Sequence, residues 1–220
     1  AFFTFHAMAL ETVWMDDALP PGAWGAAGGS DAWSWVTSNP APFSGGSAHQ
    51  SKLVSGVHYH YFSGAAAPLA IQAGDQLITY VFLDPANPPR ELMLQWFDGS
   101  SWAHAAYWGA NLIPWGTDGT PSQRPMGSLP PAGQWARLEV PASLVRLEGR
   151  SISGMDFILY DGRATWDAVG KSNASSPPPG DASPPSAAIT SPANNATVSG
   201  TAVTVSAAAS DDVGVTGLQF

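Results

Sequence analysis

Short runs of β-branched and aromatic residues, separated by glycine, proline, asparagine and aspartate, recur through most of this chain. No segment between residues 11 and 170 keeps the apolar spacing of a helix for more than about one turn. Runs of this kind, closed by turn residues, are typical of strands in a sandwich or jelly roll. We therefore predict an all-β fold, with its clearest strands at 57–62, 76–83, 91–97, 102–108, 135–140 and 155–160.

The composition agrees with this fold class and excludes several partners. Charged residues make up 11% of the chain, whereas Gly (23), Pro (20) and Trp (10) are abundant. The formal net charge of -9 repels phosphate, so we expect no nucleic-acid partner. Cysteine is absent, which excludes disulfides and thiolate metal sites. No apolar run approaches the roughly 18 residues that span a bilayer, so we expect no membrane insertion.

A proline- and serine-rich stretch divides the chain. Residues 173–186 cannot bury a core and favour extended conformations, so we predict a linker there. We place a β-sandwich domain at 11–172 before it and a second domain at 187–220 after it. Residues 1–10 contain the small-residue pattern Ala7-Met8-Ala9, and we expect them to be either a leader peptide or the remnant of an upstream segment.

Residues 187–220 contain Ile189-Thr190-Ser191-Pro192-Ala193-Asn194, Val203-Thr204-Val205-Ser206-Ala207 and Asp211-Asp212-Val213-Gly214-Val215. In these motifs the segment resembles the opening of bacterial immunoglobulin-like repeats. Such sandwiches need about 100 residues, so we expect this segment to be the N-terminal part of an incomplete domain. Its unpaired strand edges are expected to offer contacts to a neighbouring chain.

The most informative stretch is a predicted hairpin formed by 91–97 and 102–108 around Asp98-Gly99-Ser100-Ser101. With a four-residue loop, one face carries polar and aromatic side chains and the other carries apolar ones. Pyranose rings stack on aromatic side chains, and sugar hydroxyls need planar polar partners, so the first face is a candidate sugar platform. The alternative is that 108–115 covers these aromatic side chains as ordinary core. The predicted pairs are Phe97 with Trp102, Gln95 with His104, and Glu91 with Trp108.

Two histidines lie two residues apart on the predicted strand at 57–62. His58 and His60 therefore point the same way, and they contact a ligand in one interpretation. In another, they hold zinc or copper together with His49 or His104. The full candidate ligand-binding set is Glu91, Gln95, Trp102, His104, Trp108, Trp115, His58 and His60.

Aspartates stand at the end of the first predicted strand and of the last. Because the first and last strands of jelly rolls commonly meet, Asp16, Asp17, Asp161 and Asp167 are candidate ligands of one structural calcium. The alternative is ordinary turn chemistry, since Asp before Gly and Asp-Asp before Ala-Leu-Pro-Pro are turn signals.

Four segments of the sandwich region form a recognisable set: Val13-Trp14-Met15-Asp16-Asp17-Ala18-Leu19-Pro20, Gly56-Val57-His58-Tyr59-His60-Tyr61-Phe62, Leu83-Asp84-Pro85-Ala86-Asn87-Pro88-Pro89-Arg90-Glu91 and Tyr160-Asp161-Gly162-Arg163-Ala164-Thr165-Trp166-Asp167. In these segments the region looks like a module repeated in large secreted or surface bacterial proteins, including Rhs-type ones. It is also similar to the galactose-binding-like jelly rolls of carbohydrate-binding modules. This resemblance implies the fold and a secreted or cell-surface location, and it names no ligand.

The sequence lacks the common enzyme motifs: it contains no nucleophile elbow, zinc-protease helix, phosphate loop or dinucleotide fingerprint. We predict a non-catalytic module that attaches a larger extracellular protein to polysaccharide. One alternative is a structural or adhesion spacer without a sugar ligand. The other is a metalloenzyme centred on the histidines.

Overall fold

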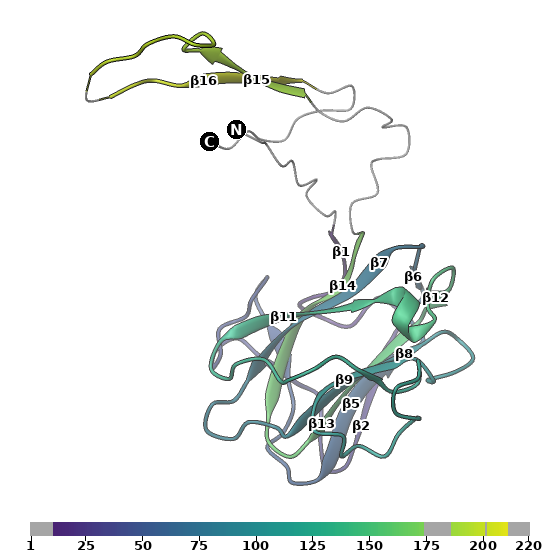
Figure 1. Cartoon of the computed structure of the whole chain (residues 1–220). Helices are drawn as coiled ribbons and strands as arrows, with labels where there is room; N and C mark the ends of the chain where they lie inside the picture. The colour runs from purple at the N-terminus through teal and green to yellow at the C-terminus, as the bar shows by residue number, and fades with distance from the viewer. Residues whose placement is uncertain (1–10, 174–185, 201, 211–220) are drawn as a thin grey trace. The chain divides into compact units, whose positions relative to one another are not determined.

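The computed structural model describes residues 11–173, 186–200 and 202–210, which fall into two compact units (Figure 1). The larger unit contains strands β1 to β14 and one short 3-10 helix, and the smaller unit contains β15 and β16. Among the described residues, no helix is long and apolar enough to cross a membrane.

The larger unit consists of two packed sheets, drawn in Figure 1 as two layers. Sheet A has the order β11-β7-β14-β4-β3, with β1 paired to β14, and sheet B has the order β10-β9-β8-β13-β5-β2. Sheet A comprises β1 (Glu11–Met15), β3 (Ser34–Val36), β4 (Ala48–Gln50), β7 (Asp75–Leu83), β11 (Trp135–Pro141) and β14 (Ala164–Asn173). Sheet B comprises β2 (Trp24–Gly28), β5 (Val57–Ser63), β8 (Glu91–Phe97), β9 (Ala105–Gly109), β10 (Arg124–Pro125) and β13 (Gly154–Tyr160). A small pair, β6 (Leu69–Ala70) with β12 (Ser151–Ile152), and the helix η1 (Ala142–Val145) complete the unit.

The chain passes repeatedly from one sheet to the other, from β4 to β5, from β7 to β8 and from β13 to β14. The predicted all-β sandwich is therefore confirmed. Its core lies between the sheets, where Phe62, Phe157 and Trp166 are fully buried. Burying a side chain of this size contributes about 2 to 3 kcal/mol each.

The sandwich closes because the first and last strands pair, as the sequence predicts for a jelly roll. In β1 and β14, Glu11 lies opposite Ser172 and Val13 opposite Gly170. A side chain at Gly170 would collide with the backbone of Thr12, since an added Cβ would lie 2.0 Å from the Thr12 carbonyl oxygen. Glycine is therefore required for the two strands to approach this closely.

The hairpin at β8 and β9 exists, but its predicted register is wrong by one residue. Gln95 lies opposite Ala105, and Leu92, not Glu91, lies opposite Trp108. The turn is longer than expected because the amide of His104 donates to the carbonyl of Trp102 (2.8 Å), which takes residues 102–104 out of the strand. A slip of one residue moves every following side chain to the other face.

The smaller unit is a hairpin of β15 (Ser186–Ser191) and β16 (Ser206–Ser210), with a register irregularity between Ile189 and Ser191. Its apolar side chains stay open to solvent, with Ile189 47% exposed. The predicted leader or upstream remnant at 1–10, most of the predicted linker, and the motif at 211–215 lie outside the described residues.

Candidate functional site

The outer side of sheet B carries a group of aromatic side chains, which we call the aromatic face. Tyr61 of β5 is at its centre, with ring centroids 5.7 Å from Trp24 and 5.8 Å from Trp102. Tyr59 contacts Trp115 at 5.1 Å. The members of the aromatic face are Trp24, Tyr59, Tyr61, Phe97, Trp102 and Trp115.

These aromatic side chains come together because β5 alternates. His58, His60 and Phe62 point into the sandwich and are fully buried, so Tyr59 and Tyr61 point outwards. Trp24 of the edge strand β2 adds a side chain that is 54% exposed. The other members come from β8 and from the loops that follow β8 and β9.

The polar groups of the aromatic face are free to bind. No hydrogen bond within the described part of the chain uses the hydroxyl of Tyr59 or Tyr61, or the indole N–H of Trp24, Trp102 or Trp115. Rings that combine an apolar surface with an open donor are suited to a ligand with both apolar and hydroxyl-bearing sides.

Two polar side chains form the floor of this face. On the central strand β13, Asp156 lies opposite Tyr61 on one side and Gln95 on the other. Asp156 is 6% exposed, and its Oδ1 atom is buried without a hydrogen-bond partner. Burial raises the pKa of Asp156 well above its usual range, because an ionised carboxyl is costly without water.

Glu91 belongs to the same side of sheet B but lies beneath a loop. Its Oε2 atom accepts hydrogen bonds from the amides of Leu112 and of Ile113, the second at 2.8 Å. Burial raises the pKa of Glu91, although these amides oppose the shift. The alternative that 108–115 covers part of the predicted platform is correct for this residue.

The structure also corrects the expected positions of Trp108 and His104. Trp108 is 7% exposed and packs in the core between the sheets, because the register slip turns it inwards. His104 is buried immediately before the start of β9, where its ring nitrogens contact the carbonyl of Val145 at 2.7 Å and the carboxylate of Asp98 at 3.3 Å. Of the predicted platform, Gln95, which is 9% exposed, and the partly exposed Trp102 lie on the side of sheet B that carries the aromatic face, and Trp115 joins them.

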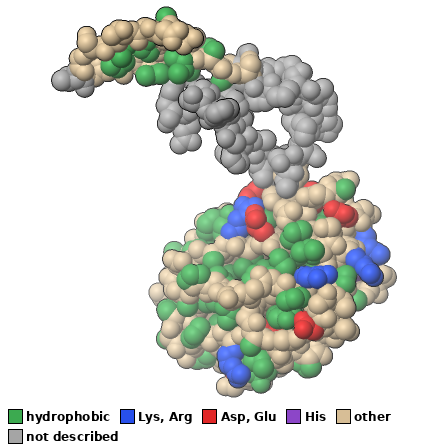
Figure 2. Space-filling model, viewed as in Figure 1, with side chains coloured by type: hydrophobic (Ala, Val, Ile, Leu, Met, Phe, Trp, Pro, Cys, Tyr) green, Lys and Arg blue, Asp and Glu red, His purple; other side chains and the backbone are tan. Residues whose placement is uncertain are grey.

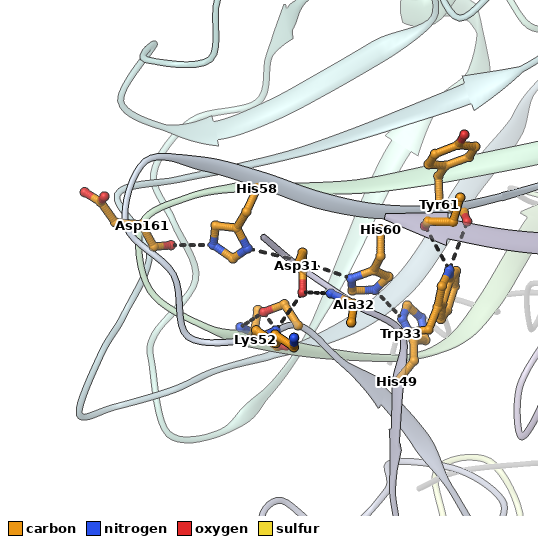
Figure 3. Close-up of polar contacts among 12 residues, drawn as sticks. Asp31, Ala32, Trp33, His49, Lys52, His58, His60, Tyr61 and Asp161 are labelled. Atoms are coloured by element: carbon orange, nitrogen blue, oxygen red, sulfur yellow. Dashed lines mark hydrogen bonds and ion pairs between the residues drawn. The ribbon is translucent and has the colours of Figure 1, made fainter. Parts of the chain in front are cut away.

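On the inner side of β5, the histidines form a buried cluster with Asp31, drawn in Figure 3. The Oδ2 atom of Asp31 lies 3.1 Å from Nδ1 of His58 and 3.2 Å from Nδ1 of His60. Nε2 of His60 lies 2.9 Å from Nδ1 of His49. Figure 3 shows His58 and His60 on one side of the strand and the ring of Tyr61 on the other.

The charges of this cluster follow from its contacts. Burial raises the pKa of Asp31, but hydrogen bonds from His58, His60 and the amide of Lys52 outweigh it and hold the pKa well below the usual range. Burial lowers the pKa of His60 and of His49, so both are neutral. A neutral His60 donates to Asp31 from Nδ1 and accepts from His49 at Nε2. This assignment leaves Nε2 of His49 as a buried acceptor without a partner.

The cluster does not have the form of the predicted zinc or copper site. Nδ1 of His58 and Nδ1 of His60 are both directed to Asp31, and His104 lies elsewhere. Across the described ranges, no three histidine or carboxylate side chains are grouped so as to hold a metal ion. Because both rings are fully buried, a ligand on the surface does not reach His58 or His60.

The four aspartates proposed for calcium do not converge either. Asp167 is buried next to Asp16, and burial together with Asp16 raises the pKa of Asp167 to about 6. Its Oδ2 atom accepts the amides of Phe43 (2.8 Å) and Ser44 (3.0 Å), and Asp17 accepts two amides of the same loop. Asp161 has other partners, since it accepts the amide of Gly56 at 2.6 Å and contacts Arg90. These carboxylates fix loops, and calcium binding stays a prediction.

Two hollows lie away from the aromatic face. One, of about 270 Å³, is on sheet A, and the other, of about 320 Å³, is beside the loops at 53–55 and 87–88. In the first, Arg163 is paired with Asp84 at 2.6 Å, and Gln50 donates to Thr165 at 2.8 Å. Their polar groups are thus already satisfied.

Comparisons with known proteins give one family match and several similar solved structures. The family described as "Bacterial Ig domain" matches residues 185–220. No curated protein is significantly similar to the chain. Among solved structures, the chain is similar to the K3 cleaved adhesin domain of Lys-gingipain from Porphyromonas gingivalis, with 15% identity, a TM-score of 0.45, and 74% of this chain and 98% of that one covered.

Two further similar structures are described as carbohydrate-binding. The family 11 module from Clostridium thermocellum, in complex with a β-1,3-1,4-mixed-linked tetrasaccharide, has 12% identity and a TM-score of 0.43, with 77% and 98% of the two chains covered. The CBM22-1 xylan-binding domain of Paenibacillus barcinonensis Xyn10C has 10% identity and a TM-score of 0.41, with 78% and 100% covered. Identity this low says nothing about the ligand of the present chain.

Proposed function

We propose that the sandwich unit is a non-catalytic module that binds polysaccharide on the aromatic face of sheet B. The observation that carries this proposal is the combination of exposed rings and unpaired polar groups on one sheet face. Trp24 is 54% exposed beside Tyr61 and Trp102, and beneath this face the Oδ1 atom of Asp156 is buried without a hydrogen-bond partner. Sugar rings stack on such side chains through their C–H groups, and their hydroxyls satisfy the polar groups.

The aromatic face belongs to a sheet surface and lies away from the two hollows described above, which suits a polymer better than a small molecule. Figure 2 shows that hydrophobic side chains cover much of the visible surface of the sandwich unit and that charged groups are scattered. Long ligands gain affinity from several weak stacking contacts along a surface, whereas small ligands need an enclosing pocket.

A binding role without catalysis is favoured by the carboxyl groups of this face. Glycoside hydrolysis needs two carboxyl groups roughly 5 to 9.5 Å apart and open to the substrate. Among the described strand residues on the outer side of sheet B, the carboxyl groups belong to Asp156 and Glu91, and the loop at 112–113 covers Glu91. Asp156 is itself 6% exposed, so these strand residues do not supply an accessible acid and base.

We place the protein outside the cell or on its surface, where it would hold a larger polypeptide on a glycan. The match of residues 185–220 to a bacterial immunoglobulin-like domain supports this location. Polysaccharide is the expected partner.

Affinity electrophoresis and isothermal titration against a panel of soluble polysaccharides test the proposal. We expect binding to at least one polymer, with a loss of about tenfold for Trp24→Ala or Trp102→Ala and more for the double variant. Phe43→Ala is the matched control, because Phe43 is 46% exposed but stacks on Tyr80 of sheet A.

The outcomes separate the alternatives. If no polysaccharide of the panel binds, the alternative of a structural or adhesion spacer without a sugar ligand is favoured. Binding that persists in the double variant but disappears in Arg163→Ala would move the site to the hollow on sheet A.

A further inference from the structure

We propose that Trp33 is a positioning residue for the aromatic face: its indole N–H ties the edge strand β2 to β5 and so holds Trp24 beside Tyr61. This inference rests on the proposed function and names the residue that prepares its site before a glycan arrives. It depends on the weakness of β2 by itself, on the two hydrogen bonds of the Trp33 indole, and on the space that Gly25 leaves for this ring.

The strand that carries Trp24 has few side-chain contacts to hold it in place. β2 lies at the edge of sheet B, and within the described ranges β5 is its only strand neighbour. Glycine or alanine fills the other four positions of β2, and both residue types are poor strand formers. Gly25 and Ala27, which face the sandwich, bring almost no apolar surface to the core. The side chains of β2 therefore do not fix the position of Trp24.

The indole of Trp33 supplies a contact that joins the two strands. Its Nε1 atom donates to the carbonyl of Ala26 on β2 (3.1 Å) and to the carbonyl of Tyr61 on β5 (3.0 Å). Ala26 and Tyr61 are direct partners in the strand register, so one N–H bridges β2 and β5 at the row that carries the Tyr61 ring. Figure 3 shows the indole nitrogen directed at the backbone of Tyr61, whose ring points the other way.

The Trp33 ring is itself fixed by the buried side of the sandwich. Its centroid lies 4.6 Å from that of His60 and 5.0 Å from that of His49, and the side chain packs against the hydrophobic core. A donor whose own position is locked by packing holds its acceptors more firmly than a mobile side chain does. The N–H of Trp33 therefore restrains β2 from beneath.

Gly25 provides the space for this indole. A Cβ atom added at Gly25 would lie 2.6 Å from Nε1 of Trp33 and 2.9 Å from its Cδ1 atom, which is closer than real contacts allow. The backbone of Gly25 is not in the left-handed region, so the close approach of the ring, and not the conformation, requires glycine here. Any larger residue would strengthen the strand but displace Trp33.

The expected effect on binding follows from preorganisation. A side chain that is ordered before the ligand arrives loses less conformational entropy when a sugar stacks on it, and affinity is higher. Without the bonds from Trp33, the edge strand and the Trp24 ring sample more positions. Trp33 lies on the inner side of β2, so it acts through Trp24 and does not touch the glycan.

The test uses the whole chain and a panel of soluble polysaccharides that includes barley mixed-linkage β-glucan, xylan and galactan. Trp33→Phe keeps a ring over His49 and His60 but removes the donor. Affinity for a polymer that the wild type binds should fall about fivefold. Trp135→Phe is the matched control, because this indole donates to the carbonyl of Ala41 (3.0 Å) at sheet A, and its affinity should equal that of the wild type.

Three further variants separate positioning from a general loss of stability. In a Trp24→Ala background, Trp33→Phe should lower affinity by less than about twofold more, because the positioned side chain is gone. Gly25→Ala should reproduce the loss seen for Trp33→Phe, since its Cβ displaces the indole without removing the donor. Asp31→Ala should lower stability more than Trp33→Phe but leave affinity nearly unchanged. Circular dichroism confirms folding of each variant.

Wild-type affinity in both Trp33→Phe and Gly25→Ala would overturn this inference. Full additivity of Trp33→Phe with Trp24→Ala, or an equal loss in Trp135→Phe, would also overturn it. In each case glycan binding that still depends on Trp24 and Trp102 would leave the proposed function standing. If the wild type binds no polymer of the panel, the proposed function fails and the inference fails with it.

Discussion

The two sides of sheet B treat polar groups in opposite ways. On the inner side, the Asp31 carboxylate has contacts from His58, His60 and the amides of Ala32 and Lys52. On the outer side, Oδ1 of Asp156 and the hydroxyls of Tyr59 and Tyr61 have no partner among the described residues. Both sides are rich in aromatic and ionisable residues, so residue type alone does not separate them. Satisfied polar groups indicate a structural role, and unsatisfied ones at an open surface indicate a ligand.

A pair of tryptophans gives the largest expected difference between the two sides. Trp108→Ala removes a core side chain and should lower the free energy of unfolding by about 3 to 5 kcal/mol. Trp102→Ala should lower it by less than about 1 kcal/mol, because Trp102 is partly exposed on the aromatic face. Urea denaturation followed by tryptophan fluorescence measures both. Similar losses for the two variants would contradict the assigned register.

Removing the acceptor of the histidine cluster should have the next largest effect. Asp31→Ala leaves two buried imidazoles and two amides without their acceptor and should cost about 3 kcal/mol of stability. Polysaccharide affinity, measured below the unfolding transition, should change little. A variant as stable as the wild type would show that the cluster does not hold the fold.

The histidines should also make stability depend on pH. Burial lowers the pKa of His49 and His60 in the folded state. Their contribution to the free energy of unfolding is therefore complete above the unfolded pKa of about 6.5, and it is lost as the pH falls below that value. Each should add a slope of up to about 1.4 kcal/mol per pH unit. Urea titrations between pH 7 and pH 5 measure this slope. His49→Asn should reduce it, and an unchanged slope would count against a neutral His49.

The smallest effect is expected at Asp167, where the sign is reversed. The pKa of Asp167 is raised to about 6 in the folded state. Its contribution to the free energy of unfolding is therefore complete below the unfolded pKa of about 3.9, and it is lost as the pH rises through about 6. Asp167→Asn should therefore flatten the fall in stability between about pH 5 and pH 7.5, while its NH2 group, which cannot accept, costs part of the backbone hydrogen bonds that the carboxylate makes. Melts with calcium and with chelator at this pH test the predicted ion. Calcium would compensate the negative charge of ionised Asp167 and raise Tm, whereas identical melts would remove that prediction.

The sequence predicted what depends on local periodicity. Alternation at 57–63 places both histidines on one side of β5, and the same pattern places Tyr59 and Tyr61 on the other side. Local periodicity does not predict the length of the turn after Phe97. The Asp98 carboxylate accepts the amides of Ser100 and Ser101 within a loop longer than four residues. Trp24 and Asp31 were missed because only long-range pairing, such as Ala26 with Tyr61, brings them to β5.

The one-way arrangement of hydrogen bonds from His49 through His60 to Asp31 has a practical consequence. Ring protons held in fully buried imidazoles exchange slowly with water and give resonances far downfield in a proton NMR spectrum. They would form an internal reporter of whether the sandwich is intact. During a titration with glycan these signals should stay in place while those of the outer tyrosines move, which would distinguish recognition from unfolding in a single sample.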